Sequence, residues 1–271
     1  MPYASQDGIN IYYEMEGQGT PIVLAHGFSM SHNDWRDNGY VTELVKTHQV
    51  ILVDGRGHGK SDKPHEPSEY KTRLLSADHI AVLDHLGIEA AHFIGYSMGG
   101  ATSFGVALYH SDRCLSLCLM GFQPFNPEDL PQTKLDIEPR PVEGLPDTPN
   151  PIMDILENGP EAWIAFWSKN VDTPLDMRKR LAANDFQALI AYRLIPDDWK
   201  DGIRGILKDL EIPCLFLAGE KDTVVLGAQE AAKVMPNCTF KLLAEMNHFD
   251  TFYRSGQVIF MIMKFLSKLP D

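Results

Sequence analysis

The chain has the run GYSMGG at residues 95–100, and no other stretch says as much about its architecture. Apolar residues at 91–95 predict a strand before the serine, and small and apolar residues at 98–109 predict a helix after it. A serine in such a strand-to-helix turn takes a strained backbone conformation, and the nearby glycines remove the Cβ atoms that would block the turn. We therefore expect Ser97 to project its hydroxyl above a sheet as a nucleophile. The alternative is a serine that caps an ordinary helix.

Strand and helix signals alternate on both sides of this turn. Short apolar runs are followed by segments of helical periodicity, a pattern typical of a parallel sheet wrapped by helices. The sequence therefore predicts an α/β fold, with a mostly parallel twisted sheet flanked by helices. The expected strands cover 9–16, 21–25, 50–54, 91–95, 115–121, 213–218 and 239–243, and the expected helices cover 72–86, 98–109 and 257–269.

The middle of the chain breaks this alternation. Nine of the eighteen prolines lie between residues 122 and 160, and proline at this density interrupts both helices and strands. Short helical patterns follow, and the strand signals resume at 213. We therefore expect a helical lid at residues 122–204, inserted into one α/β core made of residues 1–121 and 205–271.

Composition limits the classes of partner. The 271 residues carry a formal net charge of −13, which disfavours binding to nucleic acid or to an anionic membrane. The four cysteines form no CxxC pair and no cluster with zinc-ligand spacing, so we expect reduced, mostly buried thiols. The first ten residues lack the pattern of a secretion signal, and the apolar run at 258–265 is interrupted by Lys264. We expect a cytoplasmic protein without a membrane span.

A serine hydroxyl needs a base to take its proton, and ten histidines are available. His248 is the preferred candidate because it follows the last expected strand, and loops at the carboxyl ends of parallel strands face one crevice. Asp222 follows the preceding strand and is the preferred orienting acid, with Glu220 and Asp250 as alternatives. The chain order Ser97, Asp222, His248 is the order expected of hydrolases with a nucleophile at this kind of turn.

Attack on a carbonyl creates an oxyanion, which needs preorganised hydrogen-bond donors. One donor should be the backbone N–H of Met98, directly after the nucleophile. The second should be the N–H of Phe28, because the turn His26-Gly27 ends the expected strand at 21–25. A turn without a catalytic role is the alternative. His58, in a glycine-rich loop, is expected to be structural.

Together these features resemble the α/β-hydrolase superfamily over nearly the whole chain outside the lid. The resemblance includes the His26-Gly27 turn, the loop DGRGHGKSD at 54–62, the GYSMGG turn, Asp222 and the final histidine. The N-terminal third looks most like a short-lid branch that contains carboxylesterases and N-acyl-homoserine lactonases. Asn247 is a departure, because glycine is commoner before the histidine in that family.

The identity of the nucleophile narrows the chemistry that this resemblance implies. Haloalkane dehalogenases and epoxide hydrolases of the fold have aspartate where this chain has Ser97, so the resemblance implies acyl transfer, with no metal or organic cofactor. The expected reaction is cleavage of a carboxylic ester or a lactone through an acyl-enzyme intermediate, and the expected partner is such a small molecule. Perhydrolysis, C–C bond hydrolysis and a hydrolase-like receptor with slow turnover are the alternatives.

Aromatic residues near the turn and in the lid are candidates for the wall of an apolar substrate pocket. Packing alone also explains aromatic side chains in short helices. The candidate wall residues are Trp35, Tyr96, Phe122, Phe125, Trp163, Phe166 and Trp167.

Overall fold

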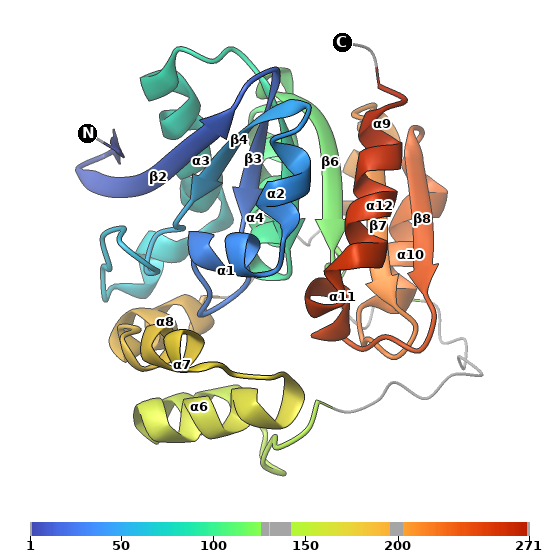
Figure 1. Ribbon diagram of the computed structural model, residues 1–271. Coiled ribbons are helices and arrows are strands. Elements are labelled where there is room, and N and C mark those ends of the chain that lie inside the picture. Colours follow the sequence, from blue (N-terminus) through green and yellow to red (C-terminus); the bar gives the residue numbers. More distant parts are fainter. Residues whose placement is uncertain (1, 126–129, 131–141, 196–202, 270–271) are drawn as a thin grey trace.

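The computed structural model describes residues 2–125, 130, 142–195 and 203–269. Within these residues, eight strands form one sheet in the order β1-β2-β4-β3-β5-β6-β7-β8. The six strands from β3 to β8 are parallel, and β1 and β2 add an antiparallel edge (Figure 1). The strands are β1 (Tyr3–Gln6), β2 (Ile9–Gly17), β3 (Thr20–Ala25), β4 (His48–Val53), β5 (Ala91–Tyr96), β6 (Cys114–Met120), β7 (Cys214–Gly219) and β8 (Cys238–Leu243).

Helices cover both faces of the sheet, which explains why β5 and β7 are buried along their whole length. Successive side chains point to opposite faces, so that Leu24 and Leu52 join one hydrophobic cluster while Val23 and Ile51 join the other. The first cluster includes side chains of α1 (His32–Asp37), α2 (Tyr40–Leu44), α11 (Asp250–Tyr253) and α12 (Ser255–Leu266). The second includes side chains of α3 (Thr72–Leu86), α4 (Met98–Tyr109), α9 (Ile203–Asp209) and α10 (Val225–Val234).

Five helices of the described residues lie between β6 and β7, and the first four form what we call the helical insert. Its helices are α5 (Pro151–Glu157), α6 (Gly159–Asn170), α7 (Leu175–Ala182) and α8 (Phe186–Arg193). Figure 1 shows α6, α7 and α8 across the end of the sheet toward which the arrow of β6 points, which is the carboxyl end of the parallel strands. The insert therefore covers the edge at which the sequence predicts the site. Residues 126–129, 131–141 and 196–202 of the expected lid lie outside the described residues.

The sequence predicted seven of these strands to within two residues at each end, and it predicted α3 and α4 with their observed bounds. It missed β1, α1, α2, α9, α10 and α11. β1 has only four residues, and it is held by antiparallel pairing with β2, where Tyr3 lies opposite Tyr12. So short a segment carries too few alternations to be recognised by periodicity.

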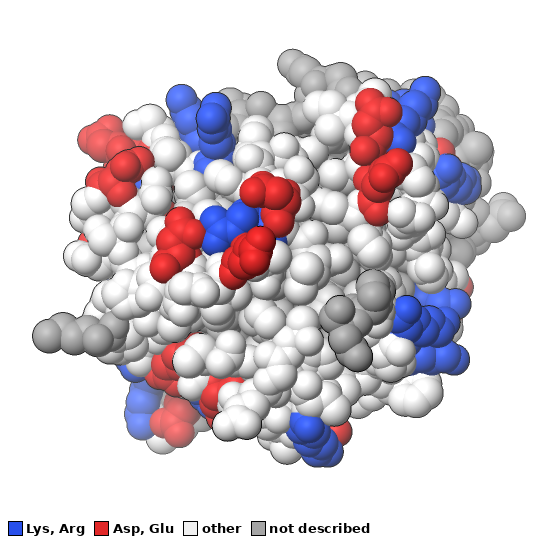
Figure 2. Space-filling view, turned by 90° about the horizontal axis from the view of Figure 1, so that it is seen from above, with Lys and Arg blue, Asp and Glu red and all other residues white. Residues whose placement is uncertain are grey.

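Charged side chains lie in small mixed groups on the surface. Figure 2 shows acidic side chains beside basic ones on one face, with uncharged surface between the groups. All four cysteines are free, and Cys114, Cys118 and Cys214 are buried, as the sequence predicts. Among the described residues, we find no helix with the length and apolar character needed to cross a membrane.

Candidate active site

Ser97 occupies the turn between β5 and α4 in a strained conformation, with φ 53° and ψ −111°. Its N–H donates to the carbonyl of Met120 in β6 at 2.8 Å, and its carbonyl accepts from the N–H of Ala101 at 3.1 Å. These bonds tie the strained residue to the sheet on one side and to the helix on the other. The structure thus confirms the predicted strand-turn-helix setting of the serine.

The glycines around Ser97 are required by close approaches of the backbone. A Cβ atom on Gly95 would lie 2.1 Å from the carbonyl oxygen of Gly99, and one on Gly99 would lie 2.0 Å from the carbonyl oxygen of Ala25. Neither distance is possible for a real side chain. The second approach also brings the start of α4 against the end of β3, so that Met98 lies beside the loop that follows β3.

Ser97, His248 and Asp222 form a continuous chain of hydrogen bonds at the carboxyl edge of the sheet. The Oγ of Ser97 lies 3.0 Å from Nε2 of His248, and Nδ1 of His248 lies 2.8 Å from Oδ2 of Asp222. Asp222 is 2% exposed, and its other oxygen accepts from the N–H of Val224 at 3.2 Å. The structure therefore brings together the three residues that the sequence selected from positions 97, 222 and 248.

Backbone contacts between the loops after β7 and β8 hold the acid and the histidine within reach of each other. The N–H of Glu220 donates to Leu243 at 2.9 Å, and the N–H of Lys221 donates to Met246 at 2.8 Å. On the other side of the imidazole, the hydroxyl of Tyr96 donates to the carbonyl of His248 at 3.1 Å. The backbone on both sides of the histidine is therefore tied to the sheet.

The alternative acids have other partners. Glu220 accepts from the N–H of Glu245 at 2.8 Å. Asp250 accepts from the N–H of Asn247 at 3.2 Å, and the amide oxygen of Asn247 accepts in return from the N–H of Asp250 at 2.9 Å. The asparagine that stands where the family commonly has glycine thus braces the loop around His248.

The contact with Asp222 defines which ring nitrogen carries the proton when His248 is neutral. A carboxylate can only accept, so Nδ1 donates to Asp222, and in the neutral imidazole the Nε2 lone pair accepts from the Ser97 hydroxyl. Burial lowers the pKa of His248, but the charge and the hydrogen bond of Asp222 outweigh burial and raise the pKa above 6.5. The imidazole is thus placed and tuned to accept a proton from Ser97.

The two predicted oxyanion donors lie at the same cavity. Phe28 and Met98 both line it beside Ser97, and within the described residues neither backbone N–H has a protein acceptor. The preceding Gly27 allows a close approach, because a Cβ there would lie 2.8 Å from the ring of Tyr96. Two free N–H groups beside a nucleophile are the arrangement that a developing oxyanion needs.

The cavity above Ser97 has a volume of about 400 Å³ and a largely apolar wall. Four of the predicted wall residues, Tyr96, Trp163, Phe166 and Trp167, line it, and so does Phe28. The sequence missed several others. These are Met30, Val142, Leu145, Ile152, Tyr192, Arg193, Lys221, Thr223, Val224 and Phe249. Phe249, Lys221 and Thr223 could have been inferred from their positions next to His248 and Asp222, but no pattern marks the rest.

Three predicted wall residues are wrong, because each is a packing residue away from the cavity. Trp35 is fully buried against Tyr40 and Phe252, at ring-centroid distances of 4.8 and 5.0 Å. Phe122 packs on Phe104 at 5.6 Å, behind α4. Phe125 is buried in the cluster on the α3 and α4 face of the sheet, where Arg204 lies 4.7 Å above its ring.

Two buried titratable side chains outside this site, those of His58 and Arg56, make contacts that hold the fold together. His58 is fully buried, its Nδ1 lies 3.0 Å from the carbonyl of Arg56, and burial lowers its pKa to about 3, in agreement with the predicted structural role. Arg56 itself forms a buried bidentate pair with Asp78, at 3.0 and 2.7 Å. No cluster of potential metal ligands occurs in the part of the chain that the structure describes.

Comparisons with known proteins agree with this architecture. A family described as "alpha/beta hydrolase fold" matches residues 20–152. The chain is 36% identical over 120 residues to the putative carbamate hydrolase RutD of Azorhizobium caulinodans, a match that spans 44% of each chain. It is 26% identical over 279 residues to a non-heme haloperoxidase of Rhodococcus erythropolis, covering 92% of this chain and 93% of that one.

A solved structure resembles nearly the whole chain. It is Est816, described as an N-acyl homoserine lactone degrading enzyme, with 27% identity and a TM-score of 0.68 over 97% of this chain and 100% of its own. Proteins of several hydrolytic and oxidative activities are therefore similar to this chain. The reaction has to be argued from its own site.

Proposed function

The chain belongs to the α/β-hydrolase superfamily, and from this premise we propose that it is a serine hydrolase that cleaves carboxylic ester or lactone bonds. The observation that carries the proposal is the continuous hydrogen-bonded chain from Ser97 through His248 to Asp222 at the base of an apolar cavity. Such a chain activates a hydroxyl for attack on a carbonyl carbon. The superfamily itself supports a hydrolytic enzyme, and the substrate class is our inference.

In the proposed mechanism, His248 Nε2 takes the proton of Ser97 as the serine oxygen attacks the carbonyl carbon. The N–H groups of Phe28 and Met98 would hold the oxyanion of the tetrahedral intermediate. The imidazolium, stabilised by Asp222, gives its proton to the leaving alcohol as the ester C–O bond breaks. Water then loses a proton to His248 and attacks the acyl-enzyme, and the acid is released with Ser97 restored. In a lactone the alcohol stays attached to the acyl group.

The wall of the cavity supports an apolar acyl or aryl group in the substrate. Aromatic and aliphatic side chains from the insert, from the turn after β3 and from the loop after β8 surround the nucleophile. The similarity to Est816 favours lactones, and the similarity to a haloperoxidase keeps perhydrolysis as the second candidate. Both reactions begin with the same acyl-enzyme, so product analysis has to separate them.

We expect multiple turnovers on a panel of p-nitrophenyl esters with short and long acyl chains, or on N-acyl-homoserine lactones, with acid and alcohol as products. The panel also includes a diketone, as a substrate for C–C bond hydrolysis, and acetate with hydrogen peroxide, as substrates for peracid formation. Release of one equivalent of product followed by arrest, with a large rise in melting temperature, would indicate a receptor instead. Faster peracid formation or C–C cleavage than ester or lactone hydrolysis would contradict the proposed substrate class.

The acid limb of the pH profile reports the state of His248. Only the neutral imidazole can accept the serine proton, and Asp222 raises its pKa above 6.5. We therefore expect kcat/KM to fall about tenfold per pH unit below a midpoint that lies above pH 6.5. The measurement uses a substrate that does not itself titrate, with circular dichroism at each pH to exclude unfolding. A rate that does not fall on acidification of the folded protein would show that His248 is not the base.

A further inference from the structure

The loop at residues 26–31, which we call the oxyanion loop, is fixed from the core by His26. The Nε2 of His26 lies 3.0 Å from the N–H of Gly55 and accepts from it, so the ring proton must be on Nδ1. That Nδ1 lies 2.8 Å from the carbonyl of Gly27 and donates to it. Burial lowers the pKa of His26, which keeps the ring neutral and this tautomer in place.

Fixing the Gly27 carbonyl also fixes the direction of the Phe28 N–H, because the two groups belong to one peptide unit. No cis peptide bond occurs among the described residues, and in a trans peptide the C=O and the N–H point in opposite directions. The N–H of Met30 also donates to the Gly27 carbonyl, at 3.1 Å. Hydrogen bonds from His26 and Met30 thus hold the Gly27–Phe28 peptide, whose N–H would be an oxyanion donor.

The next residue, Ser29, is strained. It has φ +60°, it is 3% exposed, and its hydroxyl has no partner among the described residues. A non-glycine residue in this conformation costs about 1–3 kcal/mol, so the surrounding structure must hold it. The contact that does so comes from the helical insert, because the side-chain N–H of Asn184 donates to the Ser29 carbonyl at 3.0 Å.

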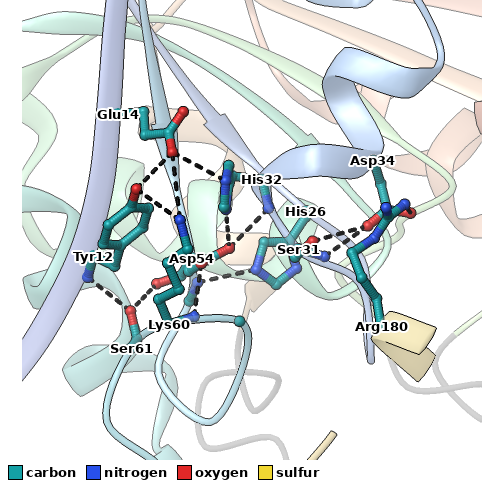
Figure 3. A network of polar contacts seen from close by, with 12 residues as sticks. Tyr12, Glu14, His26, Ser31, His32, Asp34, Asp54, Lys60, Ser61 and Arg180 are labelled. Atoms are coloured by element: carbon teal, nitrogen blue, oxygen red, sulfur yellow. Dashed lines mark hydrogen bonds and ion pairs between the residues drawn. The ribbon is translucent and has the colours of Figure 1, made fainter. Parts of the chain in front are cut away.

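A second contact from the same part of the insert holds the far end of the oxyanion loop. Arg180 of α7 lies 2.6 Å from Asp37 and 3.4 Å from Asp34. Asp34 accepts in turn from the N–H of Ser31 at 2.9 Å. Figure 3 shows Arg180 reaching the pair formed by Asp34 and Ser31, with His26 on the opposite side of the loop. The loop is therefore held between the core and the insert.

We propose that Asn184 is a positioning residue, through which the seating of the helical insert sets the geometry of the oxyanion hole. The Ser29 carbonyl and the Met30 N–H belong to one peptide unit, so release of that carbonyl weakens the bond from Met30 to the Gly27 carbonyl. The Gly27–Phe28 peptide can then turn, and its N–H moves away from the oxyanion. The inference rests on the proposed acyl transfer at Ser97. The further step is that the insert helps to stabilise the transition state, in addition to covering the cavity.

The test is the pair Asn184→Ala and Asn184→Asp. The second keeps the shape of the side chain but replaces the donor by a carboxylate oxygen, so both should fail to hold Ser29. Loss of one oxyanion donor lowers kcat by about 10²–10³-fold, and for a displaced donor we expect a loss of about 10–100-fold with KM changed less than about threefold. Affinity for an alkyl boronic acid, which forms a tetrahedral adduct with serine, should fall by a similar factor.

Asn158→Ala is the matched control, because its side chain also donates to a backbone carbonyl, that of Asp154 at 2.6 Å, but within the insert. Its kcat should remain within about threefold of the wild type, the range that bounds a surface change. A raised KM with unchanged kcat in the Asn184 variants would mean that Asn184 only seats the insert, and it would overturn the inference. Wild-type protein without ester or lactone hydrolysis would instead refute the proposed function.

Discussion

Replacement of Ser97 by alanine is expected to lower kcat/KM for ester hydrolysis by about four to six orders of magnitude, with the protein still folded. Alanine lacks the hydroxyl oxygen that lies 3.0 Å from Nε2 of His248, so no acyl-enzyme can form. The residual rate would come from direct attack of water on the carbonyl carbon, with the oxyanion donors still stabilising the tetrahedral intermediate. The measurement is the initial rate on the best substrate of the panel, with mass spectrometry of an organophosphonate adduct to identify the modified residue.

Ser103→Ala makes a matched control for this variant. Ser103 lies in α4, the helix that follows Ser97, and it is 1% exposed. Its hydroxyl has no partner among the described residues, and it does not line the cavity. Its activity should stay within about threefold of the wild type, because an unpartnered buried hydroxyl contributes little when removed. Comparable hydrolysis by Ser97→Ala and Ser103→Ala would end the assignment of the nucleophile.

The three triad residues that the sequence predicted have one property in common, because each of them follows a strand. Ser97, Asp222 and His248 come after β5, β7 and β8, and parallel strands deliver their carboxyl ends to one edge whatever the side chains around them. The glycines at 95 and 99 indicated that the turn has no room for a Cβ atom, and in the structure such an atom would lie 2.1 or 2.0 Å from a backbone oxygen. Topology and backbone sterics can therefore be read from a single sequence.

Side-chain contacts between distant segments could not be predicted in the same way. Trp35 was expected at the pocket, but its ring packs against Phe252, more than two hundred residues later, and only the fold brings them together. Asn184 gave no signal at all, because one amide donating to one carbonyl leaves no periodicity or spacing. The wall of the pocket and the contacts of the insert depend on such side-chain contacts between distant segments, so the sequence did not predict them.

Substitution of Asp222 by asparagine is expected to lower kcat by about 10⁴-fold, because it reverses the tautomer of the base. The N–H of Val224 donates to Oδ1 of Asp222 and would keep the amide oxygen of the asparagine on that side. The amide NH₂ would then face Nδ1 of His248 and donate to it, which moves the ring proton to Nε2. An Nε2 that carries a proton cannot accept one from Ser97, although every heavy atom stays in place.

The measurement is kcat on the best panel substrate, with the melting temperature to show that the variant is folded. Glu220→Gln is the matched control, since it removes a carboxylate two residues away that accepts from the N–H of Glu245 and not from His248, and its kcat should stay within about threefold. The loss in Asp222→Asn should not be recovered by raising substrate concentration, because the fault lies in proton transfer and not in binding. Activity of Asp222→Asn equal to that of Glu220→Gln would mean that a different carboxylate orients His248.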